Sequence, residues 1–209
     1  MPWPWVSILE SAVFAALAFG LRSLVQYRRT GTSGFRLASS RGVERLTTLA
    51  VSIAMVLWQV VPVATLLGWL PPLPSLDRDA VHAAGLVIGV LGMAATLWAQ
   101  FSMGASWRVG VDSQERTALV TGGPFGWVRN PIYSAMLIFA VGGALLVPNL
   151  LAPISLLALI VSLDLQVRYS EEPYLMKLHG PAYLDWASRV GRFIPGIGRL
   201  SNQRLSEGG

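Results

Sequence analysis

The sequence has no cysteine, only two histidines and few charged residues. Without cysteine the chain forms no disulfide and offers no thiolate as a nucleophile or metal ligand. His82 and His179 are too few for an all-histidine zinc site, so no metal site is predicted. Charged residues make up 13% of the chain and hydrophobic residues 53%, whereas soluble domains carry roughly 25% charged residues. The composition therefore indicates a membrane protein built as a single bundle from residues 1–209.

Five apolar segments alternate with more polar ones along the chain. They are residues 5–25, 46–69, 80–102, 132–147 and 150–167. The first three are long enough for a membrane-spanning helix of about 20 residues. The last two are shorter and are separated by Pro148 and Asn149, a turn signal that predicts a tight helical hairpin. Gly85 and Gly89 form a small-xxx-small pattern typical of close helix contacts. We therefore predict an all-α polytopic protein with about five transmembrane helices.

The basic residues are distributed unevenly around these segments. Of the 16 lysines and arginines, 15 lie in residues 22–45, 103–131 and 168–209, and five spans place these regions on one side of the membrane. Only Arg78 then lies on the other side. By the positive-inside rule the basic side is cytoplasmic, so the amino terminus is predicted outside and the carboxyl terminus in the cytoplasm. The net charge of +5 is attributed to contact with anionic membrane lipids and not to nucleic-acid binding.

Residues 119–133 are glycine-rich and precede the fourth apolar segment. Gly123, like its neighbouring glycines, permits backbone conformations and a close ligand approach that other residues do not. Asn130 favours the N-cap position and Pro131 the first helical turn, so a helix is predicted to begin here. The free N–H groups at that helix terminus and the guanidinium of Arg129 favour an anion such as a carboxylate. The alternative is an ordinary helix start with an interfacial arginine.

A second polar segment, residues 168–192, follows the fifth apolar segment. Glu171 and Glu172 are expected in the first turn of a helix capped by a serine, where carboxylates suit the helix dipole. The alternative is an amphipathic helix at the membrane surface, which accounts for the apolar side chains but only partly for the paired glutamates. Asp164 and Arg168 are four residues apart and are expected to form a helical ion pair.

The order of these residues resembles that of the isoprenylcysteine carboxyl methyltransferase family. The pattern is Leu-Val-Thr-x-Gly-x-Phe-x-x-x-Arg-Asn-Pro-x-Tyr at residues 119–133, then an apolar hairpin, then Glu-Glu-x-x-Leu-x-x-x-x-Gly-x-x-Tyr. The resemblance extends from about Gln100 to Pro195, nearly half of the chain. It implies a methyltransferase of a bacterial inner membrane that binds S-adenosylmethionine at its cytoplasmic face and methylates a lipophilic acceptor. Residues 1–102 would form three transmembrane helices, and residues 103–209 the cofactor-binding loop, the hairpin and the cytoplasmic tail.

The resemblance also implies roles for individual residues. The cofactor-contacting residues of the family fall on Gln100, Thr117, Ala118, Leu119, Val120, Phe125, Asn130, Pro131, Ile132 and Tyr133. The acidic cofactor contact falls on Glu171 or Glu172, and the substrate arginine falls on Arg168. Asn130 and Phe125 stand where the family usually has a histidine and a tyrosine. Asparagine does not titrate, which argues against proton transfer at position 130.

The chemistry of the residues suits this cofactor. The predicted helix terminus and Arg129 would take its carboxylate, and Glu171 or Glu172 would accept hydrogen bonds from its ammonium or ribose hydroxyls. Aromatic side chains would flank the adenine or face the sulfonium. Arg108 and Arg168 are candidates for holding an acidic acceptor, and together with Glu172 they form the candidate catalytic set.

Two other functions stay open on the sequence. A membrane reductase of the sterol type has a similar carboxyl-terminal half but binds NADPH, whose 2′-phosphate favours a larger basic cluster than this chain provides. A non-catalytic membrane scaffold would need the polar segments only to flank its helices. No strand-linked Gly-x-Gly-x-x-Gly pattern occurs, which excludes a Rossmann-type methyltransferase. The methyl acceptor is left open among a carboxylate, a thiol, an amine and a hydroxyl.

Overall fold

The computed structural model describes residues 3–35, 42–109 and 118–200, and within these ranges every regular element is a helix. Extended residues there pair only in isolated bridges. The predicted all-α fold is confirmed. The elements are α1 (Trp3–Ala15), η1 (Ala16–Leu21), α2 (Arg22–Thr30), α3 (Val43–Leu66), α4 (Asp79–Ser102), η3 (Gly104–Ser106), η4 (Gly123–Gly126), α5 (Pro131–Leu146), α6 (Leu151–Gln166), η5 (Val167–Glu171), α7 (Glu172–His179) and α8 (Pro181–Arg189).

Two helices are longer than the sequence predicted. The π-helical turn η1 joins α1 to α2, so that Trp3–Thr30 forms one helix of 28 residues. In the same way, η5 joins α6 to α7 over Leu151–His179, a helix of 29 residues. The predicted spans ended at residues 25 and 167 because the apolar character of the sequence ends there. A π-helical turn widens a helix locally without ending it, so both helices continue into polar sequence.

Four helices have the length and apolar composition to cross a membrane. They are Trp3–Thr30, Val43–Leu66, Asp79–Ser102 and Leu151–His179. The remaining apolar helix, α5, has 16 residues and packs between α4 and α6. Four of the five predicted spans are therefore long apolar helices, and the fourth in the sequence is a shorter helix enclosed by its neighbours.

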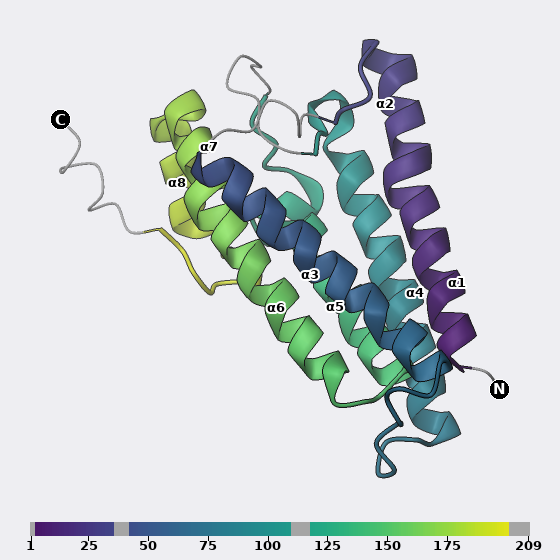
Figure 1. Cartoon of the computed structure of the whole chain (residues 1–209). Coiled ribbons are helices and arrows are strands. Elements are labelled where there is room, and N and C mark those ends of the chain that lie inside the picture. Colours follow the sequence, from purple (N-terminus) through teal and green to yellow (C-terminus); the bar gives the residue numbers. More distant parts are fainter. Residues whose placement is uncertain (1–2, 36–41, 110–117, 201–209) are drawn as a thin grey trace.

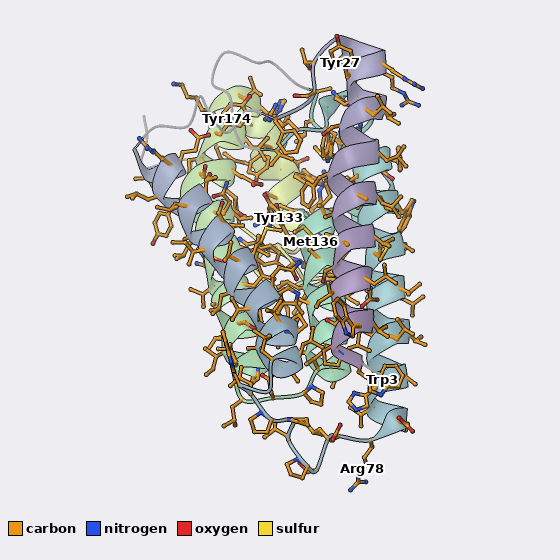
Figure 2. The ribbon with its side chains drawn as sticks, turned by 45° about the vertical axis from the view of Figure 1, so that its right-hand side comes forward. Trp3, Tyr27, Arg78, Tyr133, Met136 and Tyr174 are labelled. Atoms are coloured by element: carbon orange, nitrogen blue, oxygen red, sulfur yellow. The ribbon has the colours of Figure 1, made fainter. Side chains whose placement is uncertain are left out.

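The helices run alternately up and down the bundle (Figure 1). The amino-terminal end of α1 and the α5–α6 connection lie at one end, and α2, α7 and α8 lie at the other. Figure 2 shows Trp3 and Arg78 at the first end and Tyr27 and Tyr174 toward the second. The described parts of the three basic regions thus lie at one end of the bundle, and Arg78 lies at the other.

The connection between α5 and α6 is the tight turn predicted at Pro148 and Asn149. The side chain of Asn149 is fully buried, and its Oδ1 accepts hydrogen bonds from the backbone N–H groups of Leu151 and Ala152, at 2.9 and 3.0 Å. Its Nδ2 donates to the hydroxyl of Thr65 at 2.7 Å, which ties the turn to α3. Asparagine therefore satisfies N–H groups that the start of a helix leaves without intrahelical partners.

Helices α4 and α5 approach closely because glycines face one another. A Cβ atom on Gly142 would lie 2.4 Å from the backbone nitrogen of Gly89, and one on Gly85 would lie 2.7 Å from the carbonyl oxygen of Gly142. Small residues allow this backbone contact in membrane helix pairs. The predicted contact role of Gly85 and Gly89 is confirmed, and the contact joins the first half of α4 to the end of α5.

Candidate functional site

A cavity of about 340 Å³ is lined by residues of α3, α4, α5 and η5, near the end of the bundle that holds α2, α7 and α8. In Figure 2, Tyr133 and Met136 lie between α1 and α3, and Tyr174 lies nearer that end. Arg108 also lines the cavity. The other predicted residues that line it are Gln100, Ala118, Leu119, Val120, Phe125, Arg129, Asn130, Pro131, Ile132, Tyr133 and Glu171.

Three predicted residues do not line the cavity. Gly123 and Glu172 lie outside its wall, and so does Arg168. The Nε of Arg168 donates to Oδ2 of Asp164 at 2.6 Å, and the Arg168 side chain is 52% exposed. The helical pair predicted for Asp164 and Arg168 is therefore present. Thr117 lies outside the described residues.

Helix α5 begins where the sequence predicted, with Asn130 at the N-cap position and Pro131 as its first residue. The side chain of Asn130 does not cap the helix, however, and its Nδ2 donates to the carbonyl oxygen of Arg192 at 3.2 Å. The predicted side-chain cap is wrong because the backbone that follows α8 lies alongside Asn130 and binds its amide. The N–H groups of the first turn, including those of Ile132 and Tyr133, consequently have no cap from this side chain.

Glu172 is the centre of a buried ion-pair cluster. Its Oε1 lies 2.6 Å from Nη2 of Arg129 and 2.9 Å from Nε of Arg192, and its Oε2 lies 2.9 Å from Nη2 of Arg192. All three residues are buried. The hydrogen bonds to Glu172 raise the pKa of the Arg192 guanidinium, so this arginine stays charged. Arg192 is an addition to the predicted residues, and the cluster joins α7 to the residues just before α5 and just after α8.

Arg129 also binds the backbone of the carboxyl-terminal segment. Its Nη1 donates to the carbonyl oxygens of Ala187 and Val190, at 3.1 and 2.6 Å, and its Nη2 donates to that of Gly198 at 3.0 Å. Within the described part of the chain, its Nε has no partner. The terminal N–H groups of this guanidinium are therefore directed to protein acceptors, and Arg129 ties the segment after α8 to the start of α5.

Glu171, unlike its neighbour Glu172, lines the cavity. It is the last residue of η5, and the hydroxyl of Tyr133 on α5 donates a hydrogen bond to its Oε1. Successive residues of an α-helix point about 100° apart, so one glutamate faces the cavity while the next faces the arginines. The π-helical turn is also typical of functional sites. The geometry thus distinguishes two glutamates that the sequence left equivalent.

Two buried amide oxygens at the cavity have no partner in the described part of the chain. They are the Oε1 atoms of Gln100 and Gln166, and both residues line the cavity. Nε2 of Gln100 donates to the carbonyl oxygen of Ala18 at 3.1 Å, which fixes the orientation of this amide. A buried acceptor without a partner costs about 1–3 kcal/mol, which favours a ligand with N–H or O–H groups. Gln166 is an addition to the predicted residues, and its signal is a polar side chain within an apolar segment.

Residues 104–109, here termed the strap, connect the first helix to the cavity. Nη2 of Arg22 and Nε2 of Gln26 donate to the carbonyl oxygens of the first two strap residues, at 2.6 and 2.8 Å. Farther along the strap, the guanidinium of Arg108 lies over the ring of Tyr174 on α7, 4.9 Å from its centroid. The strap therefore bridges α2 and α7, and its last four residues line the cavity.

Two comparisons with known proteins cover this part of the chain. Residues 80–182, which include α4, α5 and α6, match the family model described as phospholipid methyltransferase. The fold is similar to the solved structure of the eukaryotic intramembrane Ras methyltransferase, isoprenylcysteine carboxyl methyltransferase, with a TM-score of 0.65 and 22% sequence identity. The similarity covers 93% of this chain and 67% of that chain. Together they confirm the resemblance to isoprenylcysteine carboxyl methyltransferase-like proteins that the sequence predicted.

A curated relative is the nickel-cobalt-cadmium resistance protein NccN of Alcaligenes xylosoxydans xylosoxydans. It is 28% identical over 141 residues, which is 66% of this chain, and the match spans 63% of the relative's length. Across residues 3–35, 42–109 and 118–200, no group of three or more histidine, aspartate or glutamate side chains is placed to hold a metal ion. The described parts of this chain therefore contain no cluster of side chains that could hold the metals in that relative's name.

Proposed function

We propose that this chain, with its phospholipid methyltransferase region and its isoprenylcysteine carboxyl methyltransferase-like fold, is an integral membrane enzyme that uses S-adenosylmethionine to methylate a lipophilic acceptor. The observation that carries the proposal is the composition of the cavity wall. Gln100, residues 118–120, residues 130–133 and Glu171 come from separate parts of the chain and line one cavity. These are the positions on which the sequence resemblance places cofactor contacts.

The lining residues fit S-adenosylmethionine. Glu171 would accept hydrogen bonds from its ammonium group, and the unpartnered Oε1 of Gln100 would accept one from an N–H or O–H group. The N–H groups at the start of α5, which the Asn130 side chain leaves uncapped, favour its carboxylate. Phe125 and Tyr133 offer aromatic faces to the adenine or the sulfonium. When bound, the cofactor supplies a methyl group on a positively charged sulfur.

The contribution of the protein to methyl transfer is alignment and the exclusion of water. Holding two reactants in the productive geometry lowers a barrier by roughly 7–11 kcal/mol. Val51, Met55 and Leu163 form an apolar part of the wall, which keeps water away from the reacting atoms. A poorly hydrated site favours a step in which the sulfonium charge disappears. Membrane helices supply these side chains, so a lipophilic acceptor would enter from the lipid.

The roles predicted for the two arginines and for Glu172 are revised in the proposal. Arg108 lines the cavity and stays a candidate contact for the acceptor, whereas Arg168 is exposed and paired with Asp164. Glu172 lies in the ion-pair cluster, and its proposed role is to position its neighbour Glu171. Of the three residues in the predicted catalytic set, only Arg108 lines the cavity, and Glu171 lines it in place of Glu172.

Neither alternative function has comparable support from the cavity. A scaffold leaves the two unpartnered amide oxygens unexplained, because burying them without a ligand is unfavourable. A reductase that binds NADPH would need cations for the 2′-phosphate. The cations among the described lining residues are Arg108, which lies over Tyr174, and Arg129, whose terminal N–H groups bind Glu172 and backbone oxygens.

The site is proposed to face the cytoplasm of a bacterial cell, with the amino terminus outside and the carboxyl terminus inside. The support is the gathering of the basic regions at the end of the bundle that holds the site. Because the chain has no cysteine, single-cysteine variants report the orientation. In inside-out inner-membrane vesicles, a membrane-impermeant maleimide should label Asp185→Cys and not Arg78→Cys. The reverse pattern would overturn the orientation.

The cofactor assignment is tested by Glu171→Gln. This variant keeps the size of the side chain and removes its charge, so the affinity for S-adenosylhomocysteine should fall about tenfold or more in nanodiscs, since hydrogen bonds to charged groups contribute about 1.5–3 kcal/mol. Asp185→Asn is the matched control, because the Asp185 side chain is exposed, lies outside the cavity lining and pairs with Arg189 along α8. Equal affinities in the two variants would contradict the assignment of Glu171.

A further inference from the structure

One part of the cavity wall is not explained by the cofactor. Helices α3 and α6 contribute Thr48, Val51 and Met55 from one side and Leu163 and Gln166 from the other. The two helices pack against each other. Helix α3 and the continuous helix Leu151–His179, which contains α6, are each long enough to cross the membrane. None of the positions that the resemblance assigns to the cofactor lies on α3 or α6. This wall, here termed the α3–α6 wall, is therefore free to contact a second molecule.

The α3–α6 wall carries two polar atoms that the fold leaves unsatisfied. The Oγ1 of Thr48 and the Oε1 of Gln166 are buried and have no partner among the described residues, and Gln166 is only 5% exposed. Ser52 on the same wall differs, because its hydroxyl donates to the backbone oxygen of Thr48 at 2.9 Å. The remaining side chains named on the wall, Val51, Met55 and Leu163, are apolar, so these two atoms are the places where it would hydrogen-bond a ligand.

The Gln166 amide defines what the ligand must offer. Its carbonyl oxygen Oε1 is buried and has no hydrogen-bond partner among the described residues. The carbonyl oxygen of Gln166 is then the atom left for the ligand. Because this oxygen only accepts, the ligand must donate, and an ionised carboxylate has no proton to donate.

The charges around the cavity argue for an uncharged donor. The described lining residues of α3 and α6 carry no charge. The charged residues among the described lining elsewhere are Arg108, Arg129 and Glu171. Glu171 accepts a hydrogen bond from Tyr133 and is assigned to the ammonium of the cofactor in the proposed function, so a second ammonium would enter beside two cations without an anion of its own. Burying an unpaired charge against apolar side chains costs far more than burying a hydroxyl that finds a hydrogen-bond partner.

We propose that the α3–α6 wall is the acceptor subsite and that it takes a lipophilic alcohol or phenol. The hydroxyl would donate to Oε1 of Gln166 and exchange a hydrogen bond with Thr48, while the hydrocarbon part packs on Val51, Met55 and Leu163. On methylation the new C–O bond would form as the C–S bond of the donor breaks, and the hydroxyl proton would pass to the Glu171 carboxylate, which lines the same cavity. This inference rests on the proposed function, because it names the acceptor class for the same cavity. It makes Gln166 and Thr48 specificity-determining residues.

The test is saturable binding of radiolabelled 1-dodecanol, dodecanoate and dodecylamine to the protein in nanodiscs, with empty nanodiscs as background. Wild-type protein should bind 1-dodecanol most tightly. Gln166→Leu and Thr48→Val should each weaken that binding about 3- to 10-fold, the usual effect of losing one neutral hydrogen bond. Ser52→Ala is the matched control and should bind like wild type, because its hydroxyl is already satisfied within α3.

Three results would overturn the inference. If wild type binds dodecanoate more tightly than 1-dodecanol, the acceptor is a carboxylate and Arg108 is its contact. If it binds dodecylamine more tightly than 1-dodecanol, the acceptor is an amine. Unchanged 1-dodecanol binding in both Gln166→Leu and Thr48→Val would remove the subsite from the α3–α6 wall. Thr48→Val keeps the test decisive if Gln166→Leu does not fold.

A parallel titration with S-adenosylhomocysteine separates this inference from the proposed function. Thr48→Val should keep its affinity for S-adenosylhomocysteine within about 2-fold of wild type, because Thr48 lies on α3, where the resemblance assigns no cofactor contact. Failure of wild type to bind S-adenosylhomocysteine would contradict the proposed function. The 1-dodecanol series would still show whether the α3–α6 wall binds an alcohol.

Discussion

Arg129 and Glu172 form a buried ion pair that joins the residue before α5's N-cap to the first residue of α7, with 2.6 Å between Nη2 and Oε1. The two side chains are 1% and 6% exposed. Arg192 binds both oxygens of the same carboxylate. The cluster therefore holds together three segments around the cavity, and it positions the elements that carry Tyr133 and Glu171.

The ion-pair cluster predicts a large stability effect from Arg129→Met. Removing one partner leaves Glu172 buried with fewer donors, and breaking a buried pair costs about 3–5 kcal/mol. The midpoint of thermal unfolding in detergent should fall clearly. Arg189→Ala is the control, because its pair with Asp185 is exposed on both sides and such pairs contribute about 0.2–1 kcal/mol. Similar midpoints for the two variants would show that the cluster is not a structural tie.

The α4–α5 contact predicts that Gly142→Ala destabilises the bundle. The new methyl group would lie 2.4 Å from the nitrogen of Gly89, so the helices would have to separate. Gly20→Ala is the matched control, because Gly20 also lies in a spanning helix and a Cβ there meets nothing within 4 Å. We expect a lower unfolding midpoint for Gly142→Ala and an unchanged or higher one for Gly20→Ala. The opposite order would contradict the close backbone contact.

The hydrogen bond from Tyr133 to Glu171 predicts a binding effect without unfolding. Tyr133→Phe removes the donor that orients the carboxylate, so the affinity for S-adenosylhomocysteine should fall about 3- to 10-fold. Tyr169→Phe is the control, because the Tyr169 ring is 60% exposed. Isothermal titration of both variants in nanodiscs checks the prediction. Full affinity in Tyr133→Phe would mean that the orientation of Glu171 does not matter for binding.

The attachment of the strap predicts that Arg22 positions the site from a distance. Arg22 is 1% exposed, binds the strap backbone and lies 4.5 Å from the ring centroid of Trp107. Arg22→Gln should release the strap, which would raise the exposure of Trp107 and weaken S-adenosylhomocysteine binding. Acrylamide quenching of tryptophan fluorescence and the titration measure the two effects. Arg28→Gln on the exposed side of α2 is the control, and equal behaviour of the two variants would contradict the role.

Local signals in the sequence predicted much of the fold and part of the site. Proline and asparagine at 148–149 predicted the turn between α5 and α6, and Pro131 predicted the start of α5. These predictions hold because turn and helix-start preferences act within a few residues. The spacing of Gly85 and Gly89 likewise predicted the contact with α5, because small residues mark close helix packing.

Contacts between distant segments could not be predicted from such signals. Arg192 reaches Glu172 only because the chain after α8 returns to the start of α5. Arg168 was assigned to the substrate by the resemblance, but its side chain is exposed and pairs with Asp164 outside the cavity wall. Gln166 appears in the sequence as one of several polar residues within the apolar segments. Its importance follows from the burial of an oxygen that the fold leaves without a partner.

The central claim is that the cavity binds S-adenosylmethionine. The most direct measurement is calorimetric titration of the purified protein in nanodiscs with S-adenosylmethionine, S-adenosylhomocysteine and NADPH. The account predicts saturable binding of the first two near one molecule per chain and no saturable binding of NADPH. Binding of NADPH alone would assign the cavity to a reductase, and binding of none of the three would contradict the claim.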